Sequence, residues 1–397
     1  MPVADFPILR AMKTIRRFLV FSALAALPLS GLAAKQLTVK AVNQLSLARP
    51  AQTLELPAKD LEPLGERDLA RIHVKDAAGK EVLCQAVDTD YDAYHTPDIV
   101  IYQADFAPNE TKTFTVFKGA KQEFTRDQFK AFGRFARERF DDFAWENDRI
   151  AHRTYGKALE TWEGEPLCSS TIDIWSKRTP RMVINEWYML DNYHEDIGEG
   201  FDDYSAGLSR GDGGNGLWAA DQLWVSRNFV NSRVLANGPI RVMFELTYEP
   251  FNVNGISVAE VKRIALDAGQ NLDHYQSFYK PYTRPGHGIA LTTGIGLKKV
   301  KGEQVEFSAD HGWLLSWQDM EKNAGKQGVA VVADPKLIEK QTEDKLNNLM
   351  LVKVPADDVA SYWVKASPFT NSEAWRKYVD DFAQGLQSPI EVKVTGP

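Results

Sequence analysis

Cysteine is scarce in this chain of 397 residues, and its scarcity excludes several classes of protein. The only two cysteines, Cys84 and Cys168, belong to no CxxC pair and have no His/Cys group close by in the sequence. Zinc-finger and thioredoxin-like sites are therefore excluded. Two widely separated cysteines also exclude a disulfide-rich scaffold, and whether they pair with each other stays open.

Positive charge is in deficit as well. The chain has 47 Lys and Arg residues against 54 Asp and Glu residues, a formal net charge of -7, and no basic stripe. Because binding to a phosphate backbone relies on a dense Lys/Arg face, we expect no nucleic-acid partner. Internal repeats, low-complexity linkers and a GKS/T phosphate loop are also absent.

Long hydrophobic runs are missing except at the N-terminus. Three basic residues between positions 13 and 17 precede the apolar run FLVFSALAALPLSGLA, and small residues follow up to Ala34. This order is typical of a secretory signal, and the run is too short for a spanning helix. We interpret residues 1–34 as a signal peptide and expect a periplasmic or secreted protein with no membrane association after cleavage.

The rest of the chain alternates apolar and polar residues with a period of two. Short runs such as KQLTVKAV and TKTFTVFKG are separated by Pro, Gly, Asn and Asp, a spacing typical of antiparallel strands. We predict a mainly β protein, a large antiparallel β-sandwich with a few short helices. An N-terminal β region over residues 35–120 and a main β region over residues 121–397 are expected to form one interlocked unit.

Two segments have helical spacing instead. The phenylalanines of residues 121–140 fall close to one helical stripe, which predicts a connector helix even though Gly133 disfavours one. The run SEAWRKYVDDFAQGL begins at an Asn/Ser cap with Glu373 close behind, which predicts a second helix from about Ser372.

Residues 141–153, DDFAWENDRIAHR, mix an aromatic ring with acids and bases. Trp145 offers a flat apolar face for the C–H surface of a sugar, and Glu146, Arg149 and His152 offer groups that bind hydroxyls. An ordinary salt-bridged strand with a core tryptophan explains the same residues.

A cluster of cations follows in SSTIDIWSKRTPRMVINEWY. Lys177, Arg178 and Arg181 lie close together in this segment. The planar guanidinium group of an arginine and the ammonium group of a lysine can both bind the carboxylate of a uronic acid. A solvated basic turn is the alternative.

The stretch YHEDIGEGFDDYSAGLSRGDGGNG, residues 193–216, places a histidine among acids. His194 with Glu195 and Glu199 fits a general base steadied by carboxylates, a divalent-cation site or a polar loop. The spacing matches no zinc motif such as HExxH, so a hard cation such as calcium is the better metal candidate.

The same stretch ends in a glycine-rich segment around Arg210. Glycine has no side chain, so it is common where a backbone turns sharply or approaches a ligand. The glycines around Arg210 therefore favour a ligand-facing role for this residue. Trp218 follows closely and strengthens a sugar-binding interpretation. In the later run RVMFELTY, Val242 and Phe244 point to one face and Arg241 to the other, so one face is core and the other is charged.

Five segments together resemble a known family: DDFAWENDRIAHRTYG, DIWSKR, the YHED to GNGLW block, NGPIRVMFELTY and KRIALDAGQNL. The chain is similar, over nearly all of its mature length, to the secreted bacterial domain-of-unknown-function family 4861. That family is more distantly similar to the galactose-mutarotase-like supersandwich, which also occurs in polysaccharide lyases and glycoside hydrolase domains. The resemblance implies a role in the breakdown of uronate-rich polysaccharides such as pectin, although a fold alone fixes no chemistry.

We therefore expect a carbohydrate-active enzyme of the lyase or hydrolase type. For β-elimination, His194 is the expected base, Arg210 and Lys177 neutralise the substrate carboxylate, and Glu146 or Glu195 orients the histidine. Hydrolysis instead needs two carboxylates beside the bond, for which Glu146 and Glu199 are the expected pair.

Two alternatives remain: a mutarotase-like epimerase, in which a His and a Glu exchange protons with the sugar, and a sugar-binding protein without turnover. No cofactor is certain, and a divalent cation is a candidate. The expected partner is an acidic oligosaccharide or polysaccharide. The expected substrate-binding residues are Trp145, Arg149, His152, Arg178, Trp218 and Arg241.

Overall fold

The structure, a computed structural model, describes residues 35–90, 96–164, 167, 170–283, 289–357, 359–367 and 371–396. The signal peptide predicted for residues 1–34 lies outside the described residues, and so does Cys168. The chain from Lys35 to Pro397 makes up one compact unit. Most of its regular structure is antiparallel strand, which confirms the predicted mainly β sandwich.

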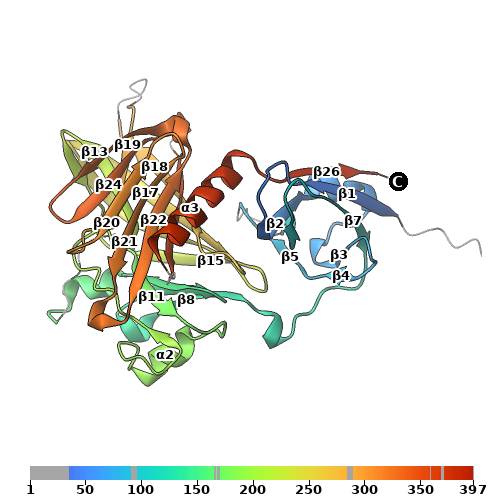
Figure 1. Ribbon diagram of the computed structural model, residues 1–397, viewed down its shortest axis with the longest axis horizontal. Helices are drawn as coiled ribbons and strands as arrows, with labels where there is room; N and C mark the ends of the chain where they lie inside the picture. Colours follow the sequence, from blue (N-terminus) through green and yellow to red (C-terminus); the bar gives the residue numbers. More distant parts are fainter. Residues whose placement is uncertain are drawn as a thin grey trace, which may run out of the picture. The chain divides into compact units, whose positions relative to one another are not determined.

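The largest sheet has eight antiparallel strands and spans the middle and end of the chain (Figure 1). Its residues alternate as the sequence predicted, with Val242 and Phe244 fully buried and Arg241 on the opposite face. In spatial order its strands are β15 (Asn231–Asn237), β16 (Arg241–Val253), β17 (Ile256–Asp267), β18 (Asp273–Pro281), β25 (Val359–Ser367), β22 (Lys326–Ala333), β21 (Trp313–Asp319) and β20 (Gln304–Ser308).

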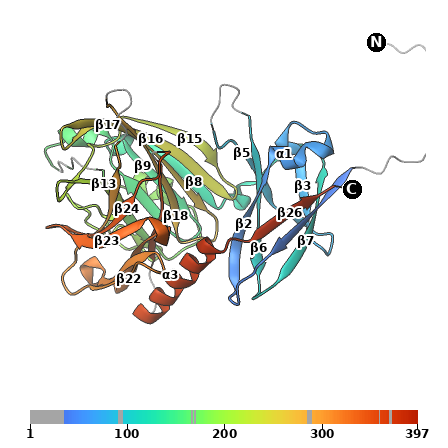
Figure 2. The same ribbon diagram turned by 90° about the horizontal axis from the view of Figure 1, so that it is seen from above.

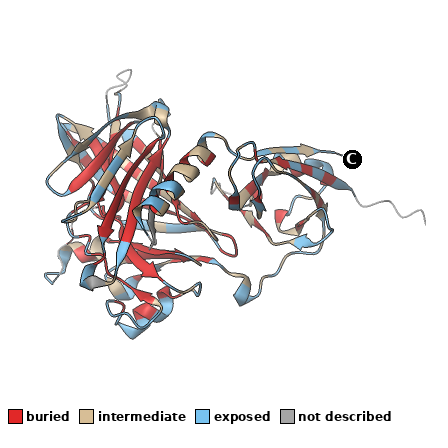
Figure 3. Ribbon diagram, in the orientation of Figure 1, coloured by how far each residue is buried: buried red, intermediate tan, exposed pale blue. Residues whose placement is uncertain are grey.

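Two five-stranded sheets share one apolar core with the inner face of this large sheet. Trp145, Phe244 and Ile295, one from each sheet, belong to a single buried cluster, and Figure 3 shows buried residues running along the strands. Removing this apolar surface from water is the main force that holds the layers together. One sheet contains β12 (Gly200–Phe201), β11 (Asp173–Lys177), β10 (Ala151–Thr154), β9 (Asp142–Asn147) and β8 (Ala131–Ala136); the other contains β14 (Gln222–Trp224), β13 (Asp212–Ala219), β19 (Thr292–Lys298), β24 (Asn347–Lys353) and β23 (Ile338–Glu343).

The N-terminal β region forms a smaller sandwich with its own buried cluster. Its first sheet includes the last strand of the chain, because β26 pairs with β1 in antiparallel register, with Thr38 opposite Thr395. In Figure 2 β26, drawn in red, lies among the blue strands of this sandwich. The two sheets contain β26 (Glu391–Thr395), β1 (Gln36–Val42), β7 (Thr111–Lys118), β3 (Ile72–Lys75) and β4 (Glu81–Val82), and β2 (Arg49–Pro57), β6 (Ile99–Phe106) and β5 (Cys84–Val87).

The helix predicted over residues 121–140 is wrong. A short 3₁₀ turn at Arg126–Gln128 is followed by β8, which pairs with β9 along its whole length. Gly133 lies so close to its neighbours that an added Cβ would stand 3.0 Å from Val242 and 3.1 Å from Trp145. Pairing with β9 and packing on the large sheet therefore outweigh the helical spacing of the phenylalanines.

The helix predicted from Ser372 is confirmed. It is α3 (Ser372–Gln387), and the side chain of Asn371 accepts a hydrogen bond from the backbone N–H of Ala374 at 2.8 Å. Its buried face, which includes Trp375 and Val379, packs on the outer side of β21 and β22. The other described α-helices are α1 (Ala58–Leu61) and α2 (Ile184–Leu190), and no described helix has the length and apolar character needed to cross a membrane.

Cys84 is a free thiol inside the N-terminal sandwich. Its Sγ donates a hydrogen bond to the carbonyl oxygen of Ile72 at 3.3 Å. Burial raises the pKa of the Cys84 thiol to about 11, so the group stays protonated and unreactive near neutral pH.

Candidate functional site

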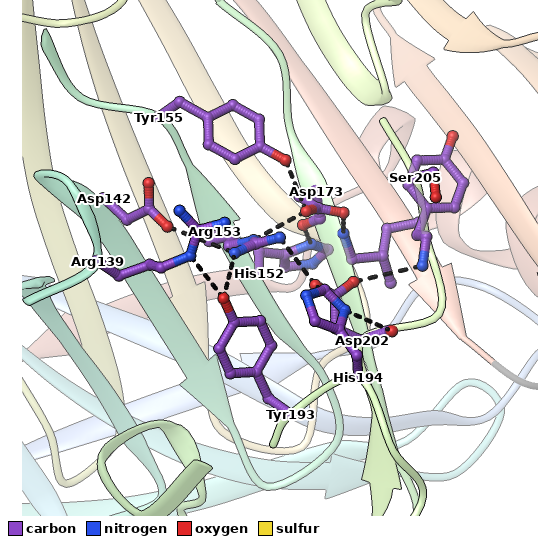
Figure 4. Close-up of polar contacts among 12 residues, drawn as sticks. Arg139, Asp142, His152, Arg153, Tyr155, Asp173, Tyr193, His194, Asp202 and Ser205 are labelled. Carbon is purple, nitrogen blue, oxygen red and sulfur yellow. Dashed lines mark hydrogen bonds and ion pairs between the residues drawn. The ribbon is translucent and has the colours of Figure 1, made fainter. Parts of the chain in front are cut away.

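A buried network of charges centres on Arg153, which lies on β10 between β9 and β11 (Figure 4). The Arg153 side chain is only 3% exposed, and its Nε lies 2.8 Å from Oδ2 of Asp173. These two residues are direct cross-strand partners, so the register of β10 and β11 brings the pair together. We call the group formed by Arg139, Asp142, Arg153, Tyr155, Asp173, Tyr193, His194 and Asp202 the Arg153 cluster.

Two further carboxylates surround the same guanidinium. Nη2 of Arg153 lies 2.8 Å from Oδ2 of Asp202, and Nη1 lies 3.5 Å from Oδ2 of Asp142. Both carboxylates are buried, so three acids contact the guanidinium of Arg153. Burial, followed by repulsion from Asp173, holds the pKa of Asp202 well above its usual range.

Aromatic rings complete the enclosure of Arg153. Its guanidinium carbon lies 5.3 Å from the ring centroid of Tyr193, 5.5 Å from that of Tyr155 and 5.8 Å from that of Trp175. The hydroxyl of Tyr155 donates a hydrogen bond to Asp173 at 2.7 Å. Because rings exclude water and attract cations, they fix the guanidinium in one position.

His194 is the point at which the Arg153 cluster meets solvent, since its side chain is 55% exposed. Its Nδ1 lies 3.4 Å from Oδ2 of Asp202 and 3.4 Å from the backbone oxygen of the same residue. A carbonyl oxygen can only accept, so the proton sits on Nδ1 and Nε2 keeps a free lone pair. Partial burial, and then the charge of Arg153, lower the pKa of His194, which favours the neutral ring.

Cations and a small recess surround this histidine. Lys322 donates a hydrogen bond to the backbone oxygen of His194, and Arg178 forms an exposed ion pair with Asp196. A recess of about 150 Å³ lies next to the histidine. It is lined by Trp187, Leu190, Asn192, Tyr193, Glu195 and Ile197.

Glu146 and Lys177, both predicted to be catalytic, form a closed ion pair away from solvent. Oε2 of Glu146 lies 2.7 Å from Nζ of Lys177, and neither side chain has any exposed surface. Glu146 also accepts hydrogen bonds from the backbone N–H groups of Val183 and Ile184 at 2.9 Å, at the start of α2. The pair is fully engaged in holding α2 against β9 and β11.

Trp145 and His152 lie in the sandwich core, where neither has exposed surface. Nδ1 of His152 donates to the backbone oxygen of Asp173 at 3.2 Å, and Nε2 lies 3.3 Å from Oδ2 of Asp273. Burial raises the pKa of Asp273 well above its usual range and lowers that of His152 to about 4, so burial favours the neutral form of both groups. Trp145 donates a hydrogen bond to the same carboxyl at 3.1 Å.

Arg210 lies in a different part of the interior from His194. Its guanidinium donates to the backbone oxygens of Ser170 and Leu208, and burial lowers its pKa to about 10. The glycines around Arg210 let neighbouring backbone segments pack closely against one another. The prediction that this segment faces a ligand is therefore corrected. An added Cβ at Gly211 would lie 1.9 Å from the oxygen of Ile172, and one at Gly216 would lie 2.4 Å from that of Trp224.

The structure therefore does not bring the predicted site residues into one cleft. Glu195 lies next to His194, but Glu199 pairs with Arg181 at 2.6 Å. The other predicted substrate-binding residues lie in separate places. Arg149 is exposed, Trp218 is half-buried on β13, and Arg241 pairs with Asp267 and Glu55 on the outer face of the large sheet.

A metal site finds no support in the described part of the chain, where no group of three or more His, Cys, Asp or Glu residues is arranged to hold an ion. Asp142, Asp173 and Asp202 do converge, but the guanidinium of Arg153 occupies the place between them.

Sequence reasoning missed Asp202 and Lys322 beside His194, and it missed the pairing of Arg153 with Asp173. Asp202 belongs to the acidic stretch that contains His194, so its charge was a usable signal. The pairing of Arg153 with Asp173 depends on strand register, and Lys322 lies 128 residues from His194 in sequence. No local pattern could have found the last contact.

Comparison with known proteins identifies the family. A family model described as a domain of unknown function, DUF4861, matches residues 42–392. The chain belongs to this family. An uncharacterized protein of Formosa agariphila is 31% identical over 380 residues, which cover 90% of this chain and 93% of that relative.

Two solved structures from Enterococcus faecalis are also similar. One is an alpha-mannosidase of strain V583, with a TM-score of 0.44 and 10% identity, and the other is a protein of glycosyl hydrolase family 38, with a TM-score of 0.46 and 11% identity. Each match covers 91% of this chain, but the chain spans only 46% and 47% of the two solved structures. At these TM-scores the matches carry no argument about activity.

Proposed function

We propose that the protein is a secreted or periplasmic carbohydrate-active enzyme that cleaves acidic, uronate-containing saccharides by β-elimination, with His194 as the base. The observation that carries this proposal is the geometry of His194. Its Nδ1 faces Asp202, its side chain is 55% exposed, and its lowered pKa favours the neutral ring. A histidine held in this way can accept a proton from a substrate through Nε2.

In the proposed reaction, Nε2 of His194 removes the proton on the carbon next to the uronate carboxylate. The electron pair of that C–H bond forms a carbon–carbon double bond, and the C–O bond on the next carbon breaks. The departing oxygen takes a proton from the imidazolium or from water. The backbone oxygen of Asp202, 3.4 Å from Nδ1, accepts the Nδ1 proton in both forms of the ring, so it orients His194 and stabilises the imidazolium that His194 becomes.

Negative charge develops on the substrate carboxylate during this step and needs a cation. Lys322 and Arg178 are the exposed cations beside His194, and they replace Lys177 and Arg210 in the role expected from the sequence. Arg153 is a positioning residue, because it holds Asp202 in place but has almost no exposed surface.

Hydrolysis is less well supported by the same geometry. A hydrolase needs two carboxylates that reach the glycosidic bond from either side. Glu146 has no exposed surface, and Glu199 is held by Arg181. Neither member of the predicted pair is free to act on a bond in solvent.

The test is incubation of the protein with uronate-containing oligosaccharides, followed by ultraviolet absorbance of unsaturated uronates and by product masses. His194→Ala should reduce turnover by a factor of about 10² to 10⁴, the usual contribution of a general base. His311→Ala is a matched control, because His311 is 54% exposed and also pairs with an aspartate, Asp380. Binding without any product would favour a sugar-binding protein, and equal turnover in both variants would exclude His194 as the base.

A further inference from the structure

The outer face of the large sheet is polar where it meets the N-terminal sandwich. Along β17, Ile264 and Leu266 are fully buried in the core, whereas Arg263 and Asp267 point to the opposite face. This face is polar for the ordinary reason that alternate residues of a strand point to opposite sides of a sheet. A polar outer face normally meets open solvent.

Here the polar face is covered instead. Arg241 pairs with Glu55 of β2 at 2.7 Å, and its backbone oxygen accepts a hydrogen bond from Gln85 of β5 at 3.1 Å. Gln103 of β6 donates to the backbone oxygen of Ala268 at 2.8 Å. These contacts hold the N-terminal strands against the sheet, while α3 covers the neighbouring strands.

A cavity of about 540 Å³ remains under this cover. Its walls include Thr53 from β2, Gln276 from β18, Trp363 from β25 and Phe382 from α3. Protein interiors are close-packed, and small-molecule sites have volumes of roughly 300 to 1,000 Å³. The size of the cavity and its mixture of polar groups and rings are those of a ligand site.

The side chains that line the cavity indicate which class of ligand it can bind. The rings of His274 and Trp363 both line the cavity and are stacked face to face, with centroids 4.5 Å apart and planes 12° apart. Each ring covers one face of the other, so the outer face of the stack is the flat apolar surface in this part of the wall. Gln276 follows on the same strand face, and its side chain makes no hydrogen bond with any described residue. A flat apolar wall next to a free amide suits a sugar ring, which has C–H surfaces and hydroxyls.

The charges around the cavity already compensate one another. Arg241 is paired with Asp267 at 2.6 Å and with Glu55 at 2.7 Å, and Arg263 shares Glu245 with Arg233. Burial lowers the pKa of His274 to about 4, which keeps that ring neutral. In this described part of the structure three arginines therefore face three carboxylates, so an uncharged ligand fits better than an acidic one.

We propose that this cavity is a second saccharide-binding site, which takes a neutral pyranose unit against His274 and Trp363 and binds its hydroxyls through Gln276. It lies on the face of β18 opposite Asp273, and so on the other side of the large sheet from the core that contains His152. The site does not depend on the chemistry proposed for His194. Arg241, expected from the sequence to bind substrate, lies in its wall.

The experiment is titration of the whole mature chain with glucose, galactose, mannose, xylose and their disaccharides, by calorimetry and by amide chemical shifts. We expect at least one neutral sugar to bind. Trp363→Ala should weaken that binding at least about 10-fold, through loss of the apolar wall. Gln276→Ala should weaken it about 3- to 10-fold, the effect of one or two hydrogen bonds.

Two controls separate this site from the one at His194. Trp218→Ala removes a half-buried tryptophan from another sheet, and His194→Ala removes the proposed base; both should leave the affinity for neutral sugars unchanged. Gln276→Ala removes no side-chain hydrogen bond among the described residues, so it remains informative if Trp363→Ala does not fold. The proposal is overturned if no neutral sugar binds, if Gln276→Ala binds as tightly as the natural chain, or if His194→Ala abolishes binding.

Discussion

Two histidine–aspartate pairs in this protein differ in the ring nitrogen that faces the carboxylate and in their access to solvent. In each, Nδ1 faces a backbone carbonyl oxygen, but the carboxylate lies 3.4 Å from that same Nδ1 in His194 and 3.3 Å from Nε2 in His152. The side chain of His194 is 55% exposed, whereas that of His152 has no exposed surface. An Nε2 that faces no carboxylate, together with access to solvent, makes His194 a candidate for catalysis, whereas His152 is a part of the core.

The largest effect on stability is expected from Arg153, which holds Asp202 of the exposed His194–Asp202 pair. Arg153→Met removes the guanidinium that contacts three buried carboxylates and should lower the free energy of unfolding by about 3 to 5 kcal/mol. Urea unfolding monitored by tryptophan fluorescence measures this loss. Arg178→Met is the matched control, because the exposed ion pair of Arg178 with Asp196 should contribute less than about 1 kcal/mol.

The buried His152–Asp273 pair should make the free energy of unfolding depend on pH in acid. The pKa of His152 is lowered to about 4 in the folded chain, whereas an unfolded histidine titrates near 6.5. Below about pH 6.5 the unfolded state therefore binds a proton that the folded state does not, and stability falls as the pH drops towards 4. The fall from this one residue should approach about 3 kcal/mol, and the half-buried His274, whose pKa is lowered to about 4, should add a slope in the same direction.

This prediction is checked by the pH dependence of unfolding in His152→Gln. The variant should lose stability less steeply than the natural chain between about pH 6.5 and 4, whatever its stability at neutral pH. His194→Gln should alter the slope much less, because half of that side chain is in water. Parallel curves for the natural chain and His152→Gln would show that His152 titrates normally.

A smaller effect is expected from Asp202, the carboxylate that the exposed pair shares with Arg153. The raised pKa of Asp202 means that the folded chain holds a proton which the unfolded chain releases above about pH 4. Its contribution to stability is greatest in acid and is lost as the pH rises. The stability difference between the natural chain and Asp202→Asn should therefore shrink as the pH rises from 5 to 8, as measured by urea unfolding. A difference that grows over this range would mean that Asp202 is ionised.

The fold was predictable wherever local pattern and tertiary packing agree. Alternation along β16 gave the correct core face, and the Asn371 cap gave the correct start of α3. The segment around Gly133 failed because its strand conformation depends on pairing with β9 and contact with Val242, which no local pattern reveals.

The candidate site was predictable only in part. His194 was found because its acidic neighbours are close in sequence, but residue type alone could not separate Glu146, which is enclosed, from Asp202, which faces the histidine. Burial decides that difference, and burial depends on segments far away along the chain. The role of His194 itself stays a prediction until turnover is measured.

The pairing of β26 with β1 has a consequence for how the chain reaches its final form. Strand partners more than 350 positions apart, such as Thr38 and Thr395, give the N-terminal sandwich a very high contact order. That sandwich cannot complete its first sheet until residues 391–395 have been synthesised. All strands of the other sheets are therefore made before this sheet can be completed.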